Sequence, residues 1–197
     1  MYYIAAVALF DLLLIAVNFV FSSVKTLPLF FKLIGLTVYG TAAAVALDAL
    51  TALIIRKLPE KWFGPDGKAF AVGKGERKFY KKIRLQRIRD KVPELGGLTG
   101  FHKDRLASAT DSEYLRRFLL EADYGMTIHF VNALCGIVLP FLPFLNVLSV
   151  SIPLALLNAV LSLLPMFLLR NNTPMLLKLY HRAADREKNE GQDSESV

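Results

Sequence analysis

Apolar residues gather in two long blocks of the chain, and a densely charged segment separates them. The blocks run over Tyr3–Ile55 and Gly125–Leu169, and the charged segment is Arg56–Tyr124. A helix that crosses a bilayer needs about 20 mainly apolar residues, so each block is long enough for two spans. Polar and proline-rich breaks divide each block, and the spans expected are about Tyr3–Val24, Leu27–Ile55, Gly125–Leu145 and Val147–Leu169.

This pattern predicts an all-α integral membrane protein, a four-span helical bundle with a basic, mainly helical cytoplasmic loop between spans 2 and 3. The expected organisation is a first transmembrane hairpin (1–55), a loop with interfacial helices (56–124), a second transmembrane hairpin (125–169) and a cytoplasmic tail (170–197). Beyond about residue 184 the tail is polar, which predicts disorder there. The N-terminus lacks the basic start and the cleavage site of a signal peptide.

The loop carries the chain's positive charge. Residues 56–124 contain 17 Lys and Arg against 10 Asp and Glu, an excess of seven that equals the net charge of the chain. Positive loops stay in the cytoplasm, so the loop and both termini of this multi-pass cell-membrane protein are expected there. A basic segment beside a bilayer is expected to meet anionic headgroups. No nucleic-acid partner is predicted, because both ends of the loop are held by spans.

Cysteine and histidine usage limits the chemistry. Cys135 is the only cysteine and lies within a span, which excludes an intramolecular disulfide and a cysteine-based metal cluster. The three histidines, at 102, 129 and 181, do not pair at ligand spacing. No metal site is therefore predicted.

Two helices are expected inside the loop. The first covers Phe79–Val92, after the turn-rich connector Gly64–Gly75. The second begins near Thr110 and Glu113, which have the spacing of a capping box. It meets no helix breaker before Gly125, so it is expected to run directly into the third span.

Each span has one polar or small-residue face when its positions are placed at about 100° per residue. Ser, Thr and Asn on these faces are expected to form hydrogen bonds between helices. Ionisable groups cost more to bury, so Asp48, Glu121 and His129 are the candidates for function. Asp11 is either a buried neutral carboxyl or a functional one.

The candidate residues share a depth in the membrane. Asp48 lies near the cytoplasmic end of the second span, His129 about one turn inside the third, and Arg170 and Asn172 at the end of the fourth. We expect them to converge on a pocket at the cytoplasmic interface. An imidazole titrates near neutral pH, so His129 is the candidate general base.

Four short motifs carry a resemblance to a known family. In chain order they are LPEKWF (Leu58–Phe63), RIRDKVPE (Arg87–Glu94), Glu121 with His129 eight residues later, and RNNTPML (Arg170–Leu176). Over roughly Leu58–Leu176 the chain resembles the glycosyl-4,4'-diaponeurosporenoate acyltransferase family of bacterial membrane proteins. The resemblance implies an activity that esterifies a sugar hydroxyl of a glycosylated carotenoid with a fatty acyl group at the membrane.

The expected function is a membrane acyltransferase that needs no cofactor. It would move a fatty acyl group from a cytoplasmic thioester donor, such as acyl-CoA, to a hydroxyl of a glycolipid or glycosylated lipid, a carotenoid-type acceptor being one option. His129 would deprotonate this hydroxyl and Glu121 would orient His129 or hold its proton. The residues expected to bind substrate are Arg170, Asn172, Asp48, Arg87 and Arg89. The alternative is a non-enzymatic membrane scaffold or small transport component, and the oligomeric state is left open.

Overall fold

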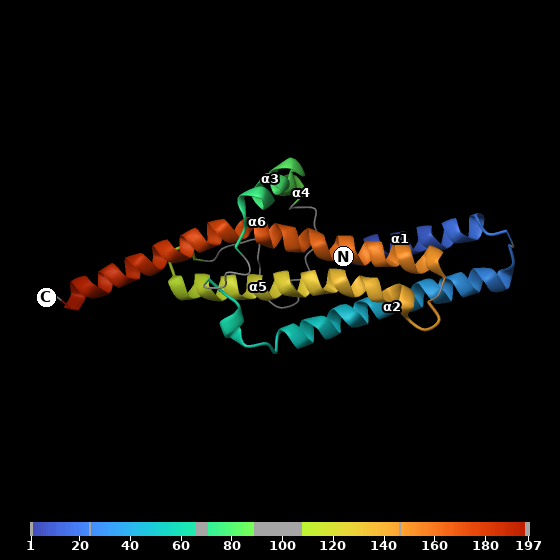
Figure 1. Ribbon diagram of the computed structural model, residues 1–197, viewed down its shortest axis with the longest axis horizontal. Coiled ribbons are helices and arrows are strands. Elements are labelled where there is room, and N and C mark those ends of the chain that lie inside the picture. The colour runs from blue at the N-terminus through green and yellow to red at the C-terminus, as the bar shows by residue number, and fades with distance from the viewer. Residues whose placement is uncertain (1, 24, 66–70, 89–107, 146, 196–197) are drawn as a thin grey trace. The chain divides into compact units, whose positions relative to one another are not determined.

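The protein is helical throughout the part of the chain that the computed structural model describes, residues 2–23, 25–65, 71–88, 108–145 and 147–195, apart from turns and connecting segments. In chain order the elements are α1 (Tyr2–Val20), α2 (Leu27–Ile55), the 3-10 turn η1 (Glu60–Trp62), α3 (Lys74–Lys82), α4 (Leu85–Ile88), α5 (Ser112–Cys135), the 3-10 helix η5 (Gly136–Phe141) and α6 (Leu148–Glu195) (Figure 1). None of these residues forms a strand, and the all-helical prediction is confirmed.

The chain divides into two compact units. The first contains Met1–Ile55 and Ile128–Leu164, and the second contains Arg56–Thr127 and Pro165–Val197. Helices α5 and α6 each contribute one part to each unit. The first unit thus contains most of the apolar blocks, and the second contains the basic segment together with the polar end of the chain.

In the first unit, α1 and α2 pack against each other. Its core consists of aliphatic side chains from α1, α2, η5, α6 and the segment between η5 and α6: Leu14, Leu33, Leu139, Leu145, Val150 and Leu154. Gly40 allows close packing in this core, because a Cβ atom there would lie 2.5 Å from Cδ1 of Leu154.

Polar side chains connect the helices of this unit, as the polar faces predicted. The hydroxyl of Thr41 on α2 donates to both carboxylate oxygens of Asp11 on α1, at 3.1 and 3.0 Å. The amide of Asn158 on α6 donates to the carbonyl of Asn132 on α5 at 2.9 Å. Asp11 therefore has a structural partner inside the helix pair.

Among the residues that the structure describes, three helical segments are long and apolar enough to cross a membrane: Leu27–Ile55, Ser112–Phe141 and Leu148–Gln192. Within the most apolar 18 residues of each segment, only 17%, 33% and 28%, respectively, are buried inside the protein. Apolar surface of this extent is stable when lipid covers it, which indicates membrane association. The first predicted span corresponds to a shorter apolar helix, Ile4–Val20, so the count of four spans stays a prediction.

In the second unit, α5 packs on the C-terminal half of α6 through Phe118, Leu119 and Leu176. Helix α3 lies on α6 as well, because the rings of Phe79 and Tyr80 contact Phe167 with centroid distances of 6.0 and 5.6 Å. These contacts fix one helix of the basic loop on α6.

The loop helices differ from the prediction in their ends. Helix α3 begins at Lys74, and the chain turns at Arg84, whose φ of 52° interrupts the helix before α4. Residues 89–107 lie outside the described part of the chain, so the end expected at Val92 is not covered. Helix α5 runs unbroken from Ser112 into the apolar block, as predicted.

The predicted capping box at the start of α5 is wrong. The carboxylate of Asp111, not the hydroxyl of Thr110, accepts the N–H of Tyr114 at 2.9 Å. Glu113 instead pairs with Arg116 and Arg117, at 2.9 and 3.0 Å. An Asp side chain is as good an N-cap as Thr, and here it lies one residue closer to the helix.

Helix α6 continues through Asp185–Glu195, a segment whose polar composition predicted disorder. Arg186, Glu187 and Lys188 in this stretch are good helix formers, and Arg186 pairs with Glu190 one turn later at 2.7 Å. Polarity alone does not exclude a helix when charges of opposite sign are four residues apart.

Candidate functional site

A polar cluster forms in the second unit where α3 meets α6. Arg170 donates from Nε and Nη2 to the two carboxylate oxygens of Glu76, at 2.5 and 2.9 Å. The hydroxyl of Tyr80 donates to the same carboxylate. The side chains of Arg170 and Glu76 are only 18% and 26% exposed, so the ion pair is largely withdrawn from solvent. Such a two-point pair fixes the plane of the guanidinium.

Hydrogen bonding and burial shift two pKa values in this cluster. The hydrogen bond from Arg170 holds the pKa of Glu76 below its ordinary value, which keeps this carboxylate charged. Burial raises the pKa of Tyr80 above its ordinary value, and the adjacent Glu76 carboxylate adds to the shift. At neutral pH the cluster therefore contains an anion, a cation and a neutral phenol.

Asp123 on α5 is a buried carboxylate of the same unit. Its side chain is 2% exposed, and it accepts the backbone N–H of Gly64 at 2.7 Å. It also interacts electrostatically with Arg170. Asp123 lies in the same unit as Glu76, Tyr80 and Arg170 and within electrostatic range of the Arg170 charge, and on that basis it is grouped with them.

The segment before α3 covers this carboxylate. The ring of Phe63 stacks on Tyr124 with a centroid distance of 4.3 Å, and the Tyr124 hydroxyl donates to the carbonyl of Leu58 at 3.0 Å. Gly64 has a φ of +97°, a conformation that favours glycine. Stacking, the hydroxyl bond and the bond to Asp123 thus anchor the LPEKWF motif and the following glycine on α5.

The predicted pair of Glu121 and His129 is not brought together. Glu121 forms an ion pair with Arg56 at 3.1 Å, and both side chains are partly exposed. Helix α5 is unbroken at Gly125, and eight residues along a helix correspond to about 12 Å of rise. His129 lies half-buried on α5, in the part of this helix that belongs to the first unit.

Of the other predicted residues, the structure describes Asp48, Asn172 and Arg87. Asp48 on α2 belongs to the first unit, and its buried Oδ1 has no hydrogen-bond partner among the described residues. Asn172 is half-buried two residues after Arg170, which places it on the opposite side of α6. Arg87 is exposed on α4, and Arg89 lies outside the described residues.

The sequence analysis did not predict three of these polar residues: Glu76, Tyr80 and Asp123. A usable signal was present in the sequence, because Glu76 is the only acidic residue between Lys74 and Ile88. A single acid in a strongly basic helix indicates a specific partner. Asp123 gave no comparable signal, since it lies off the apolar face of its helix. Within the described residues, no group of three or more His, Cys, Asp or Glu side chains is placed to hold a metal ion.

The cluster lies entirely within a region that matches a known family. The family of glycosyl-4,4'-diaponeurosporenoate acyltransferases matches residues 59–182, well over half of the chain. The chain belongs to this family. Comparison with curated proteins and with solved structures gave no match.

Membership in this family makes the protein an acyltransferase, as the resemblance implied. The alternative of a non-enzymatic scaffold or transport component is therefore set aside. Asp123, the Glu76–Arg170 pair and all of the LPEKWF motif except Leu58 lie inside the matched residues.

Proposed function

We propose that this acyltransferase moves a fatty acyl group from a thioester donor to a hydroxyl of a glycosylated lipid at the membrane. The family name supplies the class of acceptor, a glycosylated carotenoid acid. The exposed apolar surfaces of the long helices support a reaction between lipid-borne substrates.

One observation carries the assignment of the site: Arg170 is held in a fixed plane by Glu76, in the same unit as the buried carboxylate of Asp123. Arg170 is also the first charged residue after the apolar run of α6, which ends at Leu169. A cation at this position would meet the carbonyl of an acyl chain that lies in the apolar layer. It would stabilise the negative oxygen that forms when a hydroxyl attacks this carbonyl.

The reaction also needs a base for the acceptor hydroxyl. The base removes the hydroxyl proton, the oxygen forms a bond to the acyl carbon, the carbon–sulfur bond breaks, and the thiolate that leaves takes up a proton. His129 remains the proposed base because an imidazole ordinarily titrates near neutral pH. Asp123 is a second candidate, since it belongs to the same unit as Arg170.

The remaining residues have supporting roles in this proposal. Arg87 and Arg89 would attract the anionic part of a donor such as acyl-CoA, and Asn172 and Asp48 would contact the substrates. Glu121 would act on bound substrate and not on His129, because its partner in the structure is Arg56.

The proposed topology places residues 56–124 and both termini in the cytoplasm, with Ile4–Val20 completing four spans. It can be tested by replacing the only cysteine, Cys135, with serine and adding single cysteines. We expect a membrane-impermeant thiol reagent to label Ser23→Cys in intact cells and Ala109→Cys only after lysis. Labelling in the opposite sense would reverse the orientation.

The decisive experiment measures transfer of a labelled acyl group from acyl-CoA to a glycolipid by purified protein. Replacing Arg170 with Lys should lower kcat by about 100-fold or more, the usual effect of losing an oxyanion donor. Exposed Arg182 provides the control, Arg182→Lys, which should keep full activity.

The two candidate bases are separated in the same assay. If His129 is the base, His129→Ala abolishes transfer while the protein remains in the membrane, and Asp123→Asn keeps measurable activity. The reverse result would assign the base to Asp123. Full activity in both variants would exclude the two residues as bases.

A further inference from the structure

Helix α3 has two unlike faces. One face packs on α6, where Tyr80 is buried against Phe167 and Glu76 binds Arg170. The other face consists of exposed cations. At about 100° per residue they occupy an arc of roughly 140° opposite Glu76 and Tyr80. They are Lys74, Arg77, Lys78, Lys81 and Lys82.

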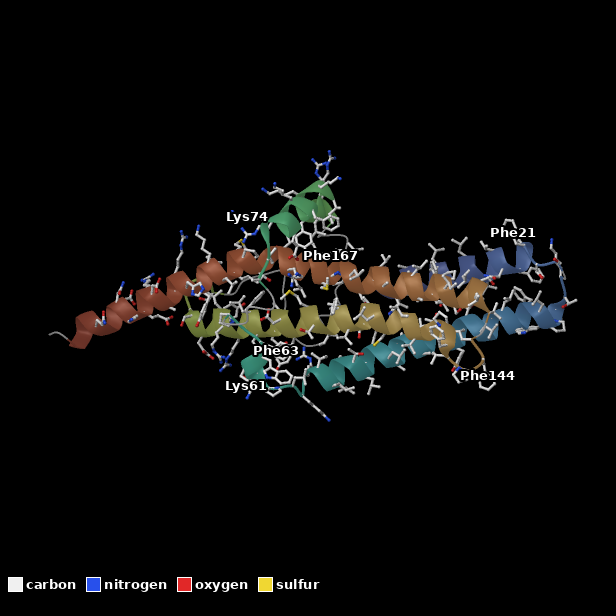
Figure 2. All side chains as sticks on the ribbon, viewed as in Figure 1. Phe21, Lys61, Phe63, Lys74, Phe144 and Phe167 are labelled. Carbon is white, nitrogen blue, oxygen red and sulfur yellow. The ribbon has the colours of Figure 1, made fainter. Side chains whose placement is uncertain are left out.

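The contacts with α6 fix the depth of α3. Phe167 and Arg170 lie on either side of the position where the apolar run of α6 ends, at Leu169. If α6 crosses the bilayer as proposed, this position lies where hydrocarbon gives way to headgroups. A helix packed on the side of α6 at this depth turns its outer face toward the surrounding lipid. Figure 2 shows nitrogen-tipped side chains of α3 projecting away from α6.

Within residues 74–88, the positive charge of this face is not balanced by acidic residues. Between Lys74 and Ile88 the only acidic residue is Glu76, whose carboxylate is bound to Arg170. Arg84 and Arg87 follow α3 and are also exposed, so seven cations lie within 14 residues. A cluster of this size beside a membrane span attracts anionic lipids.

We propose that the cationic face of α3 binds the headgroups of anionic phospholipids. Phe79 flanks this face and is 47% exposed, which suits an aromatic ring at the membrane interface. The cations extend over more than two helical turns, so they fit several headgroups better than the compact phosphates of one soluble donor. The inference rests on the proposed insertion of α6 and not on the chemistry of acyl transfer.

The experiment compares lipids retained by the purified full-length protein. Detergent-solubilised protein is mixed with phosphatidylglycerol or phosphatidylcholine, and native mass spectrometry counts the bound lipids. The test variant is Lys78→Gln, Lys81→Gln and Lys82→Gln combined. The matched control neutralises three exposed cations farther along α6, Lys178→Gln, Arg182→Gln and Lys188→Gln, which lie about 12 to 27 Å beyond Arg170 along the helix.

We expect wild type and the control to retain phosphatidylglycerol in preference to phosphatidylcholine, and to lose this preference at high salt. The α3 variant should bind phosphatidylglycerol about fivefold more weakly per cation removed, on the order of 100-fold in total. Thermal unfolding of each variant shows whether it is folded, and Lys81→Gln alone provides a milder substitution.

Three results would overturn the proposal. One is unchanged phosphatidylglycerol retention in a folded α3 variant. Another is displacement of the bound lipid by micromolar coenzyme A, which would assign the face to a soluble phosphate ligand. The third is extraction of the protein from membranes by alkaline carbonate, which would show that α6 is not inserted in the bilayer. Acyl transfer is measured in detergent as well, because it tests the catalytic assignment independently of lipid binding by α3.

Discussion

The guanidinium of Arg170 and the carboxylate of Glu76 form a two-point ion pair across 94 residues of sequence, at 2.5 and 2.9 Å. This pair connects α3 of the basic loop to the residue that follows the apolar run of α6. It fixes a cation in place and also attaches an otherwise basic helix to the protein. The same contact therefore supports both the proposed site and the proposed lipid-binding face.

Replacing Arg170 with Lys should lower the free energy of unfolding by about 1.5–3 kcal/mol, because one amine cannot make both bonds to Glu76. Glu76→Gln should cost a similar amount. The double variant should lose clearly less than the sum, since both substitutions remove one interaction. Chemical unfolding in detergent measures all three, with Arg182→Lys as the exposed control. Strictly additive losses would show that the pair does not stabilise the fold.

The ion pair also predicts a pH dependence. The pKa of Glu76 is lowered in the folded protein from an ordinary value of 4.5. The stabilising effect of the ionised Glu76 carboxylate is therefore complete above pH 4.5. It is lost as the pH falls through the lower pKa that Glu76 has in the folded protein. The stability difference between wild type and Glu76→Gln should be largest near neutral pH and should shrink below about pH 4.5. A difference that grows on acidification would contradict the assigned shift.

Gly64→Ala should destabilise the segment that covers Asp123. The φ of Gly64 is +97° and no heavy atom lies within 4 Å of a Cβ placed there, so the cost is backbone strain of about 1–2 kcal/mol and not a clash. Trypsin should cleave after Lys57 or Lys61 faster in this variant than in wild type. Gly73→Ala is the matched control, because its φ of −72° suits alanine. Equal cleavage rates in the two variants would exclude strain at Gly64.

The substitution Asp48→Leu distinguishes an effect of Asp48 on stability from an effect on substrate binding. The buried Oδ1 of this carboxylate has no partner among the described residues, so an apolar side chain should leave the unfolding free energy unchanged or raise it by about 1 kcal/mol. If Asp48 contacts substrate as proposed, the same variant should raise KM or lower kcat. Thermal unfolding and acyl-transfer kinetics measure the two effects. Unchanged kinetics would make Asp48 a residue without a role in the reaction.

The sequence by itself was sufficient for the ends of α2, the unbroken course of α5 and the family. Helix α2 has the predicted ends Leu27 and Ile55, because the length of an apolar run and the charges that end it are local properties. The unbroken α5 was predicted for the same reason, since it contains no proline and only one internal glycine. The four motifs led to the family whose model matches residues 59–182.

The composition of the site was decided by the tertiary structure. The position of Arg170 at the end of the fourth predicted span identified this residue but not its partner Glu76. The sequence of two segments 94 residues apart does not show which of their residues meet. Asp123 lies off the apolar face of α5 and would be solvent-exposed on an isolated helix. It is buried because Gly64 and the preceding motif cover it. Burial of a polar residue depends on what packs over it, and helical period cannot supply this information.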